Sequence, residues 1–308
     1  MCRYSLPRGV RAAFALGFAV LLAPSRAGAD PAPTVEWNPA WPKFRPAEVA
    51  VTGAMTLQLA SALFLYPQPK RNWEGGILFD DPVRNVLRLH TRSARESASR
   101  SSDVIYYALA AYPILDATLV AGVVHGSSEV MVQLLAMDLE AFAFSGAIAL
   151  TAEKLGRVRP EDRGCQSDPH YSKDCGNDAQ LNSSFMSGHT TMAFTGAGLI
   201  CAHHLHLPLY GGGAPDTLTC VAALGAASAA GAMRVMADKH YSTDVLLGMS
   251  VGLFSGYGLP ALLHYRHGGG AGQASLLPAF HSVRTGVDAV LAPSFGPGVA
   301  GVTLVGTF

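Results

Sequence analysis

The chain has 308 residues, of which 49% are hydrophobic and only 14% are charged, against roughly 25% charged residues in an average soluble domain. Such a composition excludes an intrinsically disordered chain. Basic and acidic residues number 22 each, so the chain lacks the overall basic field typical of nucleic-acid-binding proteins, and we expect no nucleic-acid partner.

The first 29 residues have the pattern of an export signal. Three arginines precede an apolar run over residues 12–23, and Ala27-Gly28-Ala29 supplies the small residues that signal peptidases accept. A permanent N-terminal anchor is the alternative, although the apolar run is short for a spanning helix. We expect residues 1–29 to be removed and residues 30–46 to form the N-terminal segment of a protein exported to the bacterial cell envelope.

Six apolar segments follow, and each is close to the roughly 20 residues with which a helix crosses a bilayer. Gly248, Gly252 and Gly256 share one helical face, as do Gly225 and Ala229, which favours close approach of neighbouring helices. The predicted fold is therefore all-α, a six-helix bundle over residues 47–267. The segments cover about residues 49–66, 104–124, 130–151, 190–206, 218–237 and 245–264.

Several ionisable residues lie inside these segments. Asp116, Asp138 and Glu140 are costly in hydrocarbon unless they face the bundle interior. A cluster of histidines near the end of the fourth segment is interpreted as an interfacial patch, and a metal site is the alternative. These histidines are His203, His204 and His206.

Two regions outside the apolar segments have a different composition. Residues 67–103 are polar and carry seven basic residues, so we interpret them as a solvated connector with a short amphipathic helix around residues 82–89. After residue 267 the chain becomes rich in Gly, Pro and small residues. Within this tail, residues 268–308, two β-prone runs flank the turn-like sequence PSFGPG and predict a small β-hairpin.

The cysteines suggest one disulfide. Cys165 and Cys175 bracket a polar loop and are expected to pair in an oxidising compartment. A zinc site that also uses His170 is the alternative, although a CxxC pair is missing. Cys201 and Cys220 lie in apolar stretches and are interpreted as small core residues.

Three polar clusters stand at the ends of helical segments, and an up-down bundle brings all three to one end. The clusters are GRVRP over residues 156–160, Ser-Gly-His over residues 187–189, and Arg234 followed by His240 and Asp244. Arg159 and Arg234 offer bidentate, charge-assisted hydrogen bonds to phosphoryl oxygens. Ser187 and the amide of Gly188 add donors at a helix N-terminus, which suits an anion. Together they predict a phosphate site.

Two histidines supply the reactive groups. His240 and Asp244 are four residues apart, so on a helical turn the carboxylate can hold one ring N–H and aim the other nitrogen at phosphorus. His240 is therefore the candidate nucleophile. His189 is the candidate general acid that protonates the leaving oxygen.

The order RP, SGH and R-x5-H-x3-D resembles the type 2 phosphatidic acid phosphatase superfamily, which also includes bacterial acid phosphatases and vanadium haloperoxidases. The similarity covers about residues 152–247 at motif level and, through the six-helix layout, most of residues 49–264. It implies that His240 is phosphorylated, that His189 is the acid and that Asp244 orients His240. It implies no metal or other cofactor. The implied phosphate ligands are Arg159, Ser187, Gly188 and Arg234.

The chain departs from the family pattern at a lysine seven residues before the motif arginine, where Ala152 stands. Loss of such a preorganised donor typically costs about 2.7–4 kcal/mol of transition-state stabilisation. Lys154 or Arg157 are the candidates to replace it. Met186 and Met233 also stand where the family has proline and serine.

We expect a metal-independent phosphoric monoester hydrolase or diphosphatase that acts on a phosphorylated lipid at a membrane. The alternatives are a soluble periplasmic acid phosphatase, a vanadate-dependent peroxidase, and a degenerate member that binds phospholipid without turnover. Six crossings from an external N-terminus would place the motifs in the cytoplasm, whereas the expected disulfide favours the opposite side. Membrane association is favoured over a soluble form.

Overall fold

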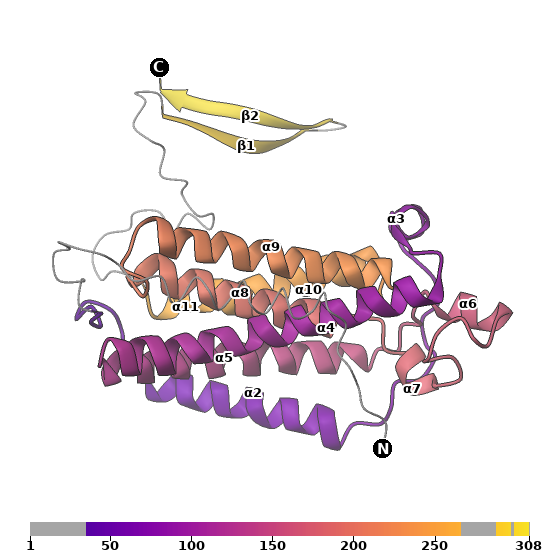
Figure 1. Cartoon of the computed structure of the whole chain (residues 1–308), viewed down its shortest axis with the longest axis horizontal. Coiled ribbons are helices and arrows are strands. Elements are labelled where there is room, and N and C mark those ends of the chain that lie inside the picture. The colour runs from indigo at the N-terminus through magenta and orange to yellow at the C-terminus, as the bar shows by residue number, and fades with distance from the viewer. Residues whose placement is uncertain (1–34, 266–287, 297–298, 308) are drawn as a thin grey trace. The chain divides into compact units, whose positions relative to one another are not determined.

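The computed structural model describes residues 35–265, 288–296 and 299–307 (Figure 1). The expected signal, residues 1–29, lies outside these ranges. The chain divides into two compact units, Met1–His267 and Gly268–Phe308. The first unit is a bundle of helices, so the predicted all-α fold class is confirmed. Its helical elements are α2 (Pro46–Phe64), α3 (Asp80–Leu87), α4 (Arg92–Leu115) with the π-helical η2 (Asp116–Val124), α5 (Ser128–Glu153), α6 (Asp162–Ser167), α7 (Asp178–Leu181), α8 (Gly188–His206), α9 (Ala214–Met236), and α10 (Ser242–Leu253) with η3 (Phe254–Gly258) and α11 (Leu259–Leu263).

Local sequence explains where the long helices begin. Thr91, Ser127 and Ser187 precede α4, α5 and α8, and each hydroxyl oxygen accepts the backbone N–H three residues further on, at 3.2, 3.5 and 3.4 Å. These hydroxyls satisfy donors that the first helical turn leaves unpaired. Pro46 opens α2, where its missing N–H costs nothing.

Helix α8 is the centre of the bundle. It packs against α4, α5, α9 and α10, and 14 of its 19 residues are buried, so helices surround it (Figure 1). The glycine face of α10 and η3 lies against it, as predicted. A Cβ atom at Gly248 would lie 2.8 Å from the carbonyl oxygen of Ser187, and Cβ atoms at Gly252 and Gly256 would also overlap the α8 backbone. Gly225 differs, because a Cβ there would meet open space.

Five helical stretches are long and apolar enough to cross a membrane, judged by length and composition. The fourth predicted segment, in α8, is not among them, because it carries polar threonines and histidines along a helix buried by its neighbours. Large apolar side chains are exposed on the outer helices, for example Leu57 and Phe64 of α2 and Val123 of η2. Such a surface supports membrane association. The five stretches are Pro46–Phe64, Arg92–Val124, Ser128–Glu153, Ala214–Met236 and Ser242–Leu263.

The ionisable residues inside the apolar segments are buried and paired. Asp138 lies 3.1 Å from the His203 ring, and Asp116 lies 3.0 Å from the His204 ring. The interpretation of an interfacial histidine patch is therefore wrong for these two histidines. Glu140 pairs in the same way with the histidine that directly follows α11, at 3.0 Å. Each pair offsets part of the cost of burying its members.

Two disulfides join parts of the bundle. The expected bond between Cys165 and Cys175 is present, with 5.3 Å between the Cα atoms, and this rules out the zinc alternative. Cys201 and Cys220 also form a disulfide, so their interpretation as unpaired core residues is wrong. The close packing of α8 on α9 brings their Cα atoms to 4.4 Å, a distance that sequence spacing does not reveal.

The second unit contains the antiparallel strands β1 (Asp288–Gly296) and β2 (Val299–Thr307). Asp288 pairs with Thr307 at one end of the ladder and Gly296 pairs with Val299 at the other. The strands correspond to the two β-prone runs that predicted a hairpin.

Candidate active site

The three motifs lie around one cavity of about 380 Å³ at the end of the bundle where α8 begins. Arg159, Gly188, His189 and His240 all line it, so each motif contributes at least one residue. Its other walls come mainly from α2, α5 and α8 and from the segment before α8. Those lining residues are Leu59, Leu63, Tyr106, Gly146, Ala149, Leu150, Glu153, Gln180, Ser183, Met186 and Met192.

His240 is held as a neutral imidazole. Its Nδ1 donates to the backbone carbonyl of Ser184 at 2.8 Å, which leaves the lone pair on Nε2. The side chain is buried, and burial together with the charges of Arg234 and Arg159 holds the pKa of His240 well below its usual range. A buried, neutral imidazole beside two guanidinium groups is suited to attack an anion that those groups bind.

Asp244 does not hold the His240 ring in the way the four-residue spacing predicted. Its carboxylate accepts the Ser184 hydroxyl at 2.7 Å and the Tyr241 backbone N–H at 3.1 Å, and it pairs with Arg157 at 2.5 Å. A carboxylate four residues after His240 would face its ring if residues 240–244 formed a helical turn, but α10 begins only at Ser242. Asp244 therefore acts on His240 indirectly: it binds the Ser184 hydroxyl, and the Ser184 carbonyl binds the His240 ring.

Two buried arginines each have one hydrogen-bond donor without an acceptor among the described residues. Arg159 donates to Ser183 at 2.9 Å and Gln180 at 3.2 Å, and Arg234 donates to Ser99 at 3.2 Å. The Nε–H of each guanidinium has no acceptor among the residues that the structure describes. An unpaired buried donor is costly, and a bound anion is a suitable acceptor for such a donor. Arg159 lines the cavity and Arg234 is not among its lining residues, but the charges of both act on His240.

Asp103 contacts both the candidate acid and a predicted phosphate ligand. Its Oδ1 lies 3.1 Å from Nε2 of His189 and 3.1 Å from Nη1 of Arg234. Burial lowers the pKa of His189, the Asp103 carboxylate opposes this shift, and the Arg234 charge reinforces it. Sequence reasoning missed Asp103, which lies outside the three motifs, at the end of the polar connector.

Ser187 and Gly188 lie at the start of α8 but in different roles. The Ser187 hydroxyl is buried, lies 2.9 Å from the Thr190 hydroxyl and caps the helix. Gly188 lines the cavity, and a Cβ atom there would have no heavy atom within 4 Å. The Gly188 position therefore leaves open space for a ligand to approach the backbone at the helix N-terminus.

Neither candidate replacement for the missing lysine lies in the cavity wall. Lys154 is the C-cap of α5 and is not among the lining residues. Arg157 is completely buried, with its guanidinium between the rings of Trp73 and Tyr241 at 4.3 Å from each. It pairs with Asp244 and, at 2.7 Å, with Asp80, which lies far away in the sequence. Arg157 is thus a structural residue.

Asp80 belongs to α3, so the polar connector is not the solvated linker that its composition suggested. Helix α3 begins two residues earlier than predicted and lies at the motif end of the bundle (Figure 1). Arg84 of α3 is buried and binds both carboxylate oxygens of Asp238, at 2.6 and 2.7 Å. The connector therefore braces the segment that carries His240.

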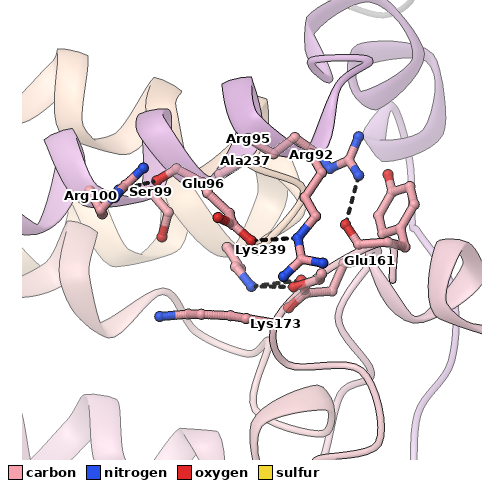
Figure 2. Close-up of a pocket in the computed structure, with 11 residues that line it drawn as sticks. Arg92, Arg95, Glu96, Ser99, Arg100, Glu161, Lys173, Ala237 and Lys239 are labelled. Carbon is pink, nitrogen blue, oxygen red and sulfur yellow. Dashed lines mark hydrogen bonds and ion pairs between the residues drawn. The ribbon is translucent and has the colours of Figure 1, made fainter. Parts of the chain in front are cut away.

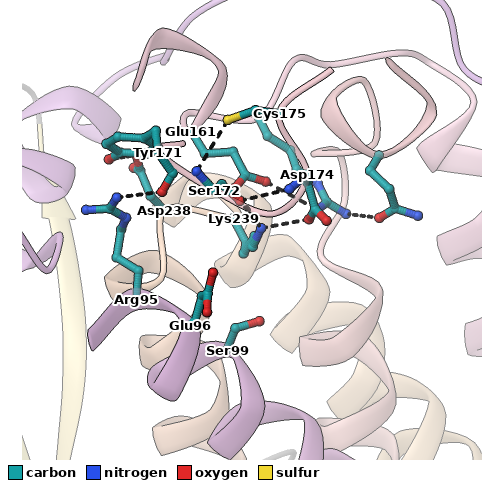
Figure 3. Close-up of polar contacts among 12 residues, drawn as sticks. Arg95, Glu96, Ser99, Glu161, Tyr171, Ser172, Asp174, Cys175, Asp238 and Lys239 are labelled. Carbon is teal, nitrogen blue, oxygen red and sulfur yellow. Dashed lines mark hydrogen bonds and ion pairs between the residues drawn. The ribbon is translucent and has the colours of Figure 1, made fainter. Parts of the chain in front are cut away.

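Figure 3 shows a network of charges around Lys239. Lys239, next to the nucleophile candidate, pairs with Glu161 at 2.6 Å and with Asp174 at 2.7 Å. Arg159 lies 3.5 and 3.4 Å from the same two carboxylates. Asp174 directly precedes Cys175, so the disulfide loop contributes to the position of a predicted phosphate ligand.

Comparison with known proteins agrees with the motif pattern. The family model described as the PAP2 superfamily matches residues 139–267, a range that begins in α5 and includes all three motifs. Searches of curated proteins and of solved structures found no match. The family match supports phosphatase-type activity on phosphate esters. Residues 139–267 of this chain are thus similar to the PAP2 superfamily.

Proposed function

We propose that the chain is a phosphatase that hydrolyses a phosphate ester or diphosphate through a phosphohistidine at His240. This proposal rests on two buried Nε–H donors, one on Arg159 and one on Arg234, that have no acceptor among the described residues and whose charges act on the neutral, buried imidazole of His240. The arginines bind the phosphoryl oxygens, together with backbone donors at Gly188, and Nε2 of His240 attacks phosphorus. The leaving oxygen departs as the P–N bond forms, and water then hydrolyses the phosphohistidine.

His189 is proposed as the acid that protonates the leaving oxygen. Its pKa is lowered in the free site, but a bound phosphate dianion favours the imidazolium that this role requires. Asp103 positions the ring through Nε2. Asp244 is a positioning residue for His240 through Ser184.

A phosphorylated lipid is the proposed substrate. Apolar side chains from α2 and α5, among them Leu59, Leu63 and Leu150, form one wall of the cavity. Both helices are long and apolar enough to cross a membrane, so the wall is continuous with surfaces that suit lipid. A cavity of about 380 Å³ holds a phosphorylated head group and the start of its chains, but not a whole lipid.

The test is phosphate release by the purified full chain in detergent from a panel of lipid phosphates and from a soluble phosphate ester, with vanadate as an inhibitor. His240→Ala should abolish release, whereas His170→Ala, which removes an exposed imidazole, should leave it unchanged. With a 32P-labelled substrate, acid-labile and alkali-stable label should appear on the wild-type chain and be absent from His240→Ala.

Equal and negligible release from the wild type and His240→Ala would refute turnover and leave a phosphate-binding protein. In that case Ala152→Lys tests whether the absent family lysine is the cause. Preference for the soluble ester over every lipid phosphate would refute the lipid assignment while leaving the phosphatase assignment intact.

A further inference from the structure

A second cavity, of about 200 Å³, lies between the first turns of α4 and the loop that the Cys165–Cys175 disulfide closes (Figure 2). Among the described residues, none lines both this cavity and the cavity at His240. The second cavity is therefore a separate feature of the motif end. Its lining residues are Arg92, Arg95, Glu96, Ser99, Arg100, Glu161, Tyr171, Ser172, Lys173, Ala237 and Lys239.

The lining is strongly cationic, although the whole chain carries no net charge. Five side chains are Lys or Arg and only two are carboxylates. The carboxylates pair with Arg92, at 2.7 Å, and with Lys239, at 2.6 Å. Within the described part of the chain, no carboxylate lies at ion-pair distance from Arg95, Arg100 or Lys173. The lining thus has three more cationic than anionic side chains, and Glu96 offsets part of the charge of Arg100 and Lys173.

The inner part of the cavity is built in advance of any ligand. Arg95 is 6% exposed, stacks 3.7 Å over the ring of Tyr171 and donates to three backbone carbonyls at 2.8–3.0 Å. Ser99 and Ser172 are also buried and add hydroxyl groups. Because these groups are already fixed, a ligand loses little side-chain entropy when it binds. Arg100 and Lys173 are exposed.

We propose that this cavity is a second anion site, which binds a phosphate group separately from the site at His240. Lys and Arg side chains with nearby hydroxyl groups are suited to phosphoryl oxygens. The cavity is smaller than the roughly 300–1,000 Å³ of pockets for drug-sized ligands, so it takes a phosphate group and not a whole lipid. The phosphate belongs either to free inorganic phosphate or to the head group of an anionic phospholipid.

Two residues that line the second cavity contact residues of the proposed active site, and one of them, Glu161, lies 3.5 Å from Arg159. The Ser99 hydroxyl lines the second cavity and accepts a hydrogen bond from Arg234 at 3.2 Å. Asp103, one turn further along α4, pairs with both Arg234 and His189. A phosphate in the second cavity therefore binds against the same helix that carries Asp103.

Equilibrium dialysis of the full chain in detergent against labelled inorganic phosphate tests the free-phosphate source. We expect two phosphates per chain in the wild type. The double variant Arg100→Gln/Lys173→Gln should retain one, and Lys70→Gln, which removes an exposed lysine outside both cavities, should retain two. Arg159→Gln removes the other phosphate, so failure of the proposed active site is measured separately.

The lipid source is tested by the amounts of phosphatidylglycerol and phosphatidylcholine that the detergent-solubilised chain retains. If a head group is the ligand, the double variant loses about one phosphatidylglycerol per chain and no phosphatidylcholine. The proposal is overturned if the double variant changes neither phosphate stoichiometry nor phosphatidylglycerol retention. It is also overturned if Lys70→Gln causes the same loss, because general surface charge would then explain the binding.

Discussion

Asp103→Asn separates the positioning of the acid from the rest of the site. One carboxylate oxygen accepts from both His189 and Arg234, each at 3.1 Å, and the amide retains the shape but not the charge. A hydrogen bond to a charged group contributes about 1.5–3 kcal/mol. Asp103 is about one-third exposed, so solvent screening reduces the two losses to a combined ~2–3 kcal/mol. At about 1.4 kcal/mol per factor of ten, we expect kcat to fall roughly 30- to 150-fold.

The assay compares two leaving groups. An alkyl phosphate requires protonation of its leaving oxygen, whereas a nitrophenyl phosphate does not, so Asp103→Asn should slow hydrolysis of the alkyl ester far more. Asp168→Asn, which changes an exposed carboxylate at the same end of the bundle, is the matched control. Equal slowing of both esters would show that Asp103 acts on phosphate binding through Arg234. An unchanged rate with the alkyl ester would refute the positioning role altogether.

The pH profile of kcat/KM should peak below pH 6.5. Activity should rise with pH through the lowered pKa of His240, because this imidazole must be neutral to attack. It should fall through the lowered pKa of His189, because this imidazole must be protonated to act as the acid. An optimum above pH 7.5 contradicts the assignment of His189 as the acid, because its lowered pKa leaves it neutral there. Gly248→Ala should destabilise the fold by about 1–3 kcal/mol in thermal unfolding, since its Cβ overlaps the start of α8, whereas Gly225→Ala should not. Arg157→Met, which leaves two buried carboxylates unpaired, should lower the free energy of unfolding by about 3–5 kcal/mol in denaturant titrations. A smaller loss would show that water compensates those carboxylates.

The sequence predicted the helical class and the gathering of the motifs because both depend on local patterns. Apolar segments of near-bilayer length separate the clusters, and an up-down arrangement places alternate junctions at one end. Arg159, Gly188, His189 and His240 consequently line one cavity. The family match over residues 139–267 agrees with this order of motifs.

Features that depend on how each helix is rotated could not be read from the sequence. Asp103 lies in a polar stretch without a recognisable motif, and only the packing of α4 on α8 turns it toward His189. Asp138 and Asp116, which pair with His203 and His204, are 65 and 88 residues away along the chain. Periodicity identifies an apolar face, but it does not say which buried carboxylate meets which imidazole.

The third motif shows how a correct spacing can be explained by the wrong geometry. The three residues between His240 and Asp244 do not place them on one helical turn, because the helix begins between them. They allow the Asp244 carboxylate to accept the Tyr241 N–H at the start of α10 while it reaches Ser184. The Ser184 carbonyl then fixes the ring of His240.

The Asp244 carboxylate is buried, which disfavours its ionised form, and its ion pair with Arg157 stabilises that form. Arg157 pairs with Asp244 on one side and with Asp80 of the connector helix on the other. A carboxylate buried alone would favour its protonated form, and a protonated group accepts hydrogen bonds less well. The connector therefore supports the candidate nucleophile through position: Asp80 holds Nη2 of Arg157 at 2.7 Å while Nη1 of the same guanidinium faces Asp244. Positioning of His240 thus depends on α3, which lies outside every motif that identified the site.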